Sequence, residues 1–132
     1  MQQAYLIGLC HYPNHELPGI PNDLALMRRA LIHQGFTPDA IQSFGDDFGT
    51  ADGLRHVLTT IRDDFADAEQ GPDSHCFFYF GGSGMLSLDP LAGGMKPLDG
   101  DDLDFRTAVP FAELNAYLPV QHGIRVTVVL DC

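Results

Sequence analysis

The stretch that decides the fold is HCFFYFGGSGM, residues 75–85. Its first half contains five bulky residues in succession, 76–80, and such a run without charge is typical of a strand buried on both faces of a parallel sheet. The turn Gly81-Gly82-Ser83-Gly84 follows, and glycines allow the backbone to approach closely and to present its N–H groups. Because active sites of open α/β sheets lie at the carboxyl ends of the strands, we expect the functional site at this turn.

Apolar patterns place the other elements around this strand. Short apolar runs predict further strands at residues 4–10, 41–44 and 124–130, and helical spacing predicts helices at residues 22–34 and 50–66. The alternation of strands and helices predicts a three-layer α/β/α sandwich with a mostly parallel sheet in the order 2-1-3-4. Residues 85–104 are expected to form an irregular excursion with a hairpin on the active-site side, and residues 110–118 a short helix.

Composition limits the classes of partner. At 132 residues the chain is large enough for one domain with a core of its own. The net charge is −11, and an acidic surface repels nucleic acid and anionic membranes, so we expect neither as a partner. The three cysteines are odd in number and have no CxxC spacing, which favours reduced thiols and a cytoplasmic location.

Five segments, in this order along the chain, carry a resemblance to a known family. They are AYLIGLCHYPN (4–14), PNDLA (21–25), QGF (34–36), FFYFGGSG (77–84) and VVLDC (128–132). They are similar to the first strand, the first helix and its end, the Gly-His-Gly turn and the Leu-Asp-x-Cys strand end of the caspase-like cysteine peptidases, within them the metacaspase and bacterial caspase-homologue branch. The resemblance covers nearly the whole chain and implies the caspase fold and an endopeptidase that cleaves after Arg or Lys.

The resemblance also assigns the catalytic positions and shows two departures from the family pattern. Ser83 occupies the position of the general-base histidine, and the N–H of Gly84 is expected to line the oxyanion hole. Cys132 stands at or next to the position of the nucleophile, one residue after Asp131 where the family has two. A serine hydroxyl cannot take a thiol proton near neutral pH as imidazole does, and loss of a general base costs ~10²–10⁴-fold in rate. We therefore expect a large-subunit domain that ends at the nucleophile strand, lacks the small subunit and is inactive as it stands.

Binding roles follow from the same resemblance. It implies that Asp23, Asp131 and Gly81 bind the substrate, and paired carboxylates favour a basic side chain, with Arg bound bidentately. An acidic segment is expected to bind Ca²⁺, because hard cations prefer several carboxylate oxygens in a flexible loop. The residues of this segment are Asp99, Asp101 and Asp102, with Asp104 beside them. The last strand is expected to expose an edge that pairs with a second copy of the chain or with a small-subunit partner.

Rival functions rest on the same turn. The alternative to a peptidase is a catalytically dead caspase-like module for binding, regulation or assembly, which Ser83 favours. A serine hydrolase is disfavoured, because Met85 stands where a G-x-S-x-G turn has its second glycine and His122 is the only histidine that follows. A phosphate-binding loop is excluded, since no Lys-Ser/Thr pair follows the glycines.

The other histidines are given no catalytic role. His75 is expected at the far end of the strand from the Gly-rich turn. His11 and His15 belong to a Pro-containing loop on the active-site side, and we expect them to be solvated loop residues.

Overall fold

The computed structural model describes residues 1–68, 71, 73–121 and 123–132. Its centre is a sheet of four parallel strands, whose order is β4-β1-β5-β9. The strands are β1 (Gln2–Gly8), β4 (Ile41–Phe44), β5 (His75–Gly81) and β9 (Arg125–Asp131). The predicted order 2-1-3-4 is confirmed, and the strand ends lie within two residues of the expected ones.

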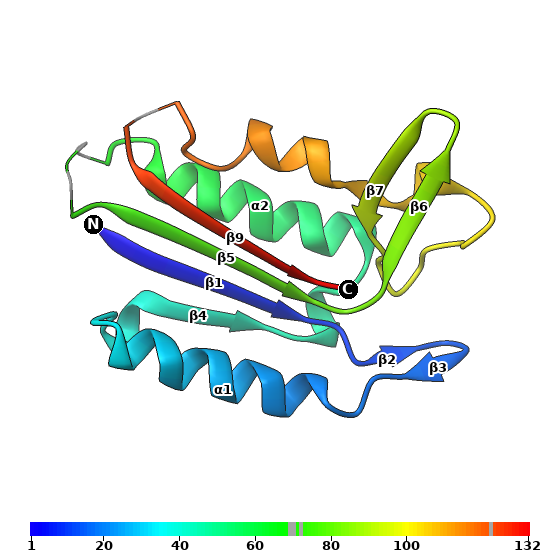
Figure 1. Ribbon diagram of the computed structural model, residues 1–132, viewed down its shortest axis with the longest axis horizontal. Helices are drawn as coiled ribbons and strands as arrows, with labels where there is room; N and C mark the ends of the chain where they lie inside the picture. The colour runs from blue at the N-terminus through cyan, green and yellow to red at the C-terminus, as the bar shows by residue number, and fades with distance from the viewer. Residues whose placement is uncertain (69–70, 72, 122) are drawn as a thin grey trace.

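Two long helices cover opposite faces of the sheet (Figure 1). The helix α1 (Ile20–His33) packs on one face and α2 (Ala51–Phe65) on the other, which confirms the three-layer sandwich. All seven residues of β5 are buried, as expected for a strand covered on both sides. No helix of the part of the chain that the structure describes is long and apolar enough to cross a membrane.

The larger apolar core lies between the sheet and α2. The helix turns its five-residue apolar stripe to the strands, and every residue of the stripe is buried: Leu54, Val57, Leu58, Ile61 and Phe65. Thr50 caps the helix, since its side chain accepts a hydrogen bond of 3.0 Å from the N–H of Gly53. On the opposite face, α1 packs closely against the end of β1. A Cβ atom on Gly8 would lie 2.7 Å from side-chain atoms of Ile20 and Leu24, so a larger residue here would displace these side chains.

Additional strands stand at the carboxyl end of the sheet (Figure 1). The hairpin β2 (His11–Tyr12) and β3 (His15–Glu16) follows β1, and a three-stranded antiparallel sheet follows β5. The latter consists of β6 (Gly84–Leu88), β7 (Leu91–Met95) and β8 (Val109–Pro110), and it confirms the expected hairpin.

The remaining elements are short 3-10 helices. They are η1 (Pro38–Ala40), η2 (Asp46–Phe48), η3 (Phe105–Thr107) and η4 (Phe111–Ala116). The helix expected at residues 110–118 is thus the shorter η4, and Leu114 within it and Leu118 after it belong to the larger core.

Candidate functional site

The Gly-rich turn between β5 and β6 is held by a buried tyrosine. The N–H of Ser83 donates to the hydroxyl of Tyr12 at 2.9 Å, and this hydroxyl donates to the carbonyl of Lys96 at 2.8 Å. The N–H of Lys96 donates back to the carbonyl of Ser83 at 2.9 Å. Burial raises the pKa of Tyr12 to about 12, although its contacts with Ser83 act to lower it, so the hydroxyl keeps its proton at neutral pH. Tyr12 therefore fixes the turn from the β2–β3 hairpin.

A histidine from the same hairpin contacts the turn. The Nε2 of His15 lies 3.0 Å from the Oγ of Ser83. The imidazole stacks on the ring of Tyr12, with ring centroids 5.1 Å apart and planes 4° from parallel. His15 is exposed, as expected, but it lies in a strand of the hairpin, which folds its imidazole back onto position 83. The signal in the sequence was Pro13-Asn14, two turn-forming residues that connect β2 and β3.

His11 braces the base of this hairpin. The carboxylate of Asp46 accepts hydrogen bonds from the N–H of Cys10 at 2.8 Å and of His11 at 3.3 Å, and it pairs with the His11 Nδ1. The hydrogen bond to Asp46 raises the pKa of His11. Burial acts to raise the pKa of Asp46, but the hydrogen bonds outweigh it and hold this pKa below its usual value. His11 is therefore a structural residue here.

The remaining histidines lie away from the turn or outside the description. His75 is at the amino end of β5, as expected, and its Nε2 lies 2.8 Å from the hydroxyl of Thr127. Burial and the neighbouring Arg125 lower its pKa. His122 lies outside the described residues.

Cys132 lies beside the turn. A Cβ atom added at Gly84 would be 3.3 Å from the Sγ of Cys132, so the absence of a side chain at position 84 gives the sulfur room. Partial burial of the sulfur and the carboxylate of Asp131 raise the pKa of this thiol. A nucleophilic cysteine requires a lowered pKa instead. The structure thus places Cys132 beside Gly84, the residue after Ser83, and raises the pKa of its thiol rather than lowering it.

The two predicted substrate carboxylates share one groove. Asp23 and Asp131 both line two adjoining hollows of about 490 Å³ and about 350 Å³, which we call the acidic groove. Tyr79 lines the larger hollow, and its hydroxyl donates to Asp131 at 3.2 Å. Burial is the main cause that raises the pKa of Tyr79 to about 12, and the neighbouring Asp131 adds to it. The smaller hollow extends to Gly82 and Cys132.

Gly81, which the resemblance placed among the substrate-binding residues, is buried and lines neither hollow. A Cβ atom there would be 2.8 Å from the Tyr79 hydroxyl, so this glycine makes room for a groove residue.

The fold and this site agree with one family of proteins. A model of the caspase domain matches residues 1–125. The chain belongs to the caspase family. Comparison with curated proteins finds no match. The family is one of cysteine peptidases that act on proteins, and the caspase domain described here has its Gly-rich turn and acidic groove at the carboxyl ends of the strands.

The carboxylates of the acidic segment, where Ca²⁺ binding is expected, contact different partners in this caspase domain. Asp99 accepts from the N–H of Ala51 at 3.0 Å, and Asp101 from the N–H of Leu103 at 3.0 Å. Asp102 pairs with the Nζ of Lys96 at 2.9 Å. Asp104 pairs with its neighbour Arg106 at 2.9 Å, and this contact holds the pKa of Asp104 below its usual value. The described residues contain no group of three or more acidic, histidine or cysteine side chains that could hold a metal ion. Asp99 and Asp101 thus bind backbone N–H groups, and Asp102 and Asp104 pair with basic side chains.

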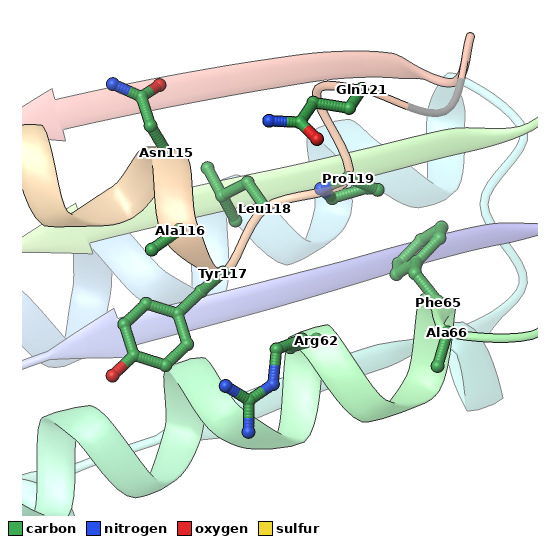
Figure 2. Close-up of a pocket in the computed structure, with 9 residues that line it drawn as sticks. All are labelled: Arg62, Phe65, Ala66, Asn115, Ala116, Tyr117, Leu118, Pro119 and Gln121. Atoms are coloured by element: carbon green, nitrogen blue, oxygen red, sulfur yellow. The ribbon is translucent and has the colours of Figure 1, made fainter.

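A further hollow of about 390 Å³ lies between the end of α2 and the segment around η4 (Figure 2). Its wall includes Arg62, whose guanidinium carbon lies 5.5 Å from the centroid of the Tyr117 ring. None of the residues that the caspase resemblance assigns to the site lines this hollow. The candidate functional site of the domain is therefore the Gly-rich turn with the acidic groove.

Proposed function

We propose that this caspase domain binds protein segments by a basic side chain in the acidic groove and does not cleave them through a cysteine. The observation that carries the proposal is the shared position of Asp23 and Asp131, which line the same two hollows beside the Gly-rich turn. A guanidinium offers its N–H donors in a planar fork that matches carboxylates, so Arg is the preferred side chain and Lys the second.

The apolar wall of the groove supports this class of ligand. Leu26, Met27 and Val129 line the larger hollow with the carboxylates. Such residues can pack against the methylene stem of Arg or Lys while the charged head pairs with Asp23 and Asp131. The net charge of −11 adds a long-range attraction for a basic segment.

Two features argue against cysteine-peptidase turnover. Position 83 carries a serine, which lacks a basic nitrogen to accept the thiol proton. The thiol of Cys132 has a raised pKa, and no imidazole contacts it in the described part of the chain. We propose on this basis that the domain acts as a binding or regulatory module. Its assignment to the metacaspase and bacterial caspase-homologue branch and to the cytoplasm remains our proposal from the sequence motifs and the cysteine content.

A labelled peptide tests the binding. A fluorescein-labelled hexapeptide with one central Arg is titrated with the protein and followed by fluorescence anisotropy, beside the same peptide with neutral citrulline. We expect Asp131→Asn to weaken binding of the Arg peptide about tenfold or more, because a charge-assisted hydrogen bond contributes about 1.5–3 kcal/mol. Asp39→Asn, a change at an exposed residue of η1, is the matched control. Equal affinity for the Arg and citrulline peptides would refute the proposal.

We also propose that β9 pairs with a second copy of the chain. Among the described residues this strand is the end of the sheet, and its Val128 and Leu130 are 40% and 37% exposed. An exposed strand edge with apolar side chains favours pairing with another strand. If the chain does not self-associate, the alternative is that a small-subunit partner pairs with the same strand.

A further inference from the structure

We propose that Ser83 and His15 form a nucleophile–base pair that takes acyl groups from esters. The contact that carries this inference is the 3.0 Å distance between the Oγ of Ser83 and the Nε2 of His15. This is the separation at which an imidazole can remove the proton of a hydroxyl as it attacks a carbonyl carbon. The family's cysteine chemistry does not use such a pair, because there position 83 is the base itself.

One residue positions both members of the pair. The ring of Tyr12 stacks on His15, and its hydroxyl accepts from the N–H of Ser83. Tyr12 is 4% exposed and pairs with His15 in the β2–β3 hairpin, so the imidazole has a rigid support. Both groups are thus held in place before a substrate arrives, which lowers the entropic cost of the reaction.

A backbone donor is available for the oxyanion. Pairs along an antiparallel ladder alternate between hydrogen-bonded and non-hydrogen-bonded. The N–H of Lys96 donates to the carbonyl of Ser83, so the next pair, Gly84 with Met95, is a non-hydrogen-bonded pair. The N–H of Gly84 therefore points away from β7, at an exposed position directly after Ser83. A preorganised N–H of this kind stabilises the tetrahedral intermediate.

The chemistry balances with water as the only co-reactant. The Oγ of Ser83 bonds to the carbonyl carbon while its proton passes to the Nε2 of His15. The bond between carbon and the alcohol oxygen then breaks, and His15 returns the proton to the leaving alcohol or phenol. Water, deprotonated by His15, releases the acid and restores Ser83. Esters suit this site better than amides, because their leaving oxygen needs less protonation in the transition state.

The groove indicates which acyl group is preferred, and this point rests on the proposed function. The smaller hollow extends from Asp23 and Asp131 to Gly82, the residue before Ser83. An acyl group with a positive end can therefore occupy the groove while its carbonyl carbon lies at Ser83. The predicted substrates are esters of acids that carry a guanidinium or ammonium group.

The test uses two p-nitrophenyl esters with the whole chain. The acetate is neutral and tests the pair alone, and the p-guanidinobenzoate also tests the groove. Release of p-nitrophenol gives the rate, and peptide mass mapping locates the acyl group. We expect acylation of Ser83, its loss in Ser83→Ala, and a rate lower by ~10²-fold or more in His15→Ala. Added imidazole should restore the rate of His15→Ala, which a structural role would not predict.

Matched controls use Ser43→Ala and His33→Gln, changes at exposed residues of β4 and α1 that should leave both rates unchanged. Acyl groups found only on Cys132 or on other residues would overturn the inference. So would a His15→Ala protein, folded by circular dichroism, that is acylated at the rate of the unmodified chain. Reaction with the acetate but no preference for the p-guanidinobenzoate would refute only the groove-based choice of substrate, and the peptide titration reports on the groove separately.

Discussion

The hydroxyl of Tyr12 is expected to be among the most important single atoms for the stability of the site. It lies in a residue that is 4% exposed, donates to Lys96 at 2.8 Å and accepts from Ser83 at 2.9 Å. Tyr12→Phe keeps the ring that stacks on His15 but removes both hydrogen bonds. The N–H of Ser83 and the carbonyl of Lys96 then lose their partner, and each unsatisfied buried group costs about 1–3 kcal/mol. We expect a loss of about 2–4 kcal/mol in the free energy of unfolding.

Urea unfolding followed by circular dichroism measures this loss. The slope with urea should be unchanged, because the surface exposed on unfolding is the same, while the midpoint falls. Tyr117→Phe is the matched control, since its ring lies over Arg62 and its hydroxyl has no hydrogen-bond partner in the described residues. A Tyr12→Phe protein within about 0.5 kcal/mol of the unmodified chain would refute the claim that this hydroxyl holds the turn, because a buried hydrogen bond contributes more than that.

Three further predictions concern the packing of α1, the contacts of Asp46 and the edge of the sheet. Gly8→Ala should destabilise the chain by about 1–3 kcal/mol in the same assay, because the added methyl group overlaps α1, and an unchanged midpoint would contradict this. Asp46→Asn should lower the free energy of unfolding more near pH 6 than at pH 3. A carboxylate whose pKa is lowered in the folded state stabilises the fold above its ordinary pKa, and this stabilisation is lost as the pH falls through the pKa of the folded state. An equal loss of stability at both pH values would show that the hydrogen bonds of the Asp46 carboxylate do not stabilise the fold. Sedimentation should show self-association that Val128→Lys weakens, whereas a monomer at every concentration would exclude pairing through β9.

The frame of the fold could be predicted because its signals are local and strong. The apolar run of β5 and the stripe of α2 each bury a continuous face, and strand–helix alternation then leaves few possible sheet orders. The position of Asp23 near Asp131 came from the resemblance to caspases and agrees with the groove.

The contact between His15 and Ser83 could not be predicted in this way. Each strand of the β2–β3 hairpin has two residues, too few for a periodic pattern, and the two side chains are 68 positions apart. The partners of the acidic segment could not be predicted for a related reason. The sequence shows how many carboxylates the segment has, but not that Lys96 pairs with Asp102 and that the N–H of Ala51 donates to Asp99.

The measurement that tests the central claim most directly is release of a fluorophore from an Arg-terminated peptide amide, with the binding of the same peptide recorded in parallel. The account predicts binding that depends on Asp131, and no release above the rate of buffer, with or without added Ca²⁺. Release that Cys132→Ala abolishes would contradict it, because Cys132 would then be a working nucleophile in spite of its raised pKa.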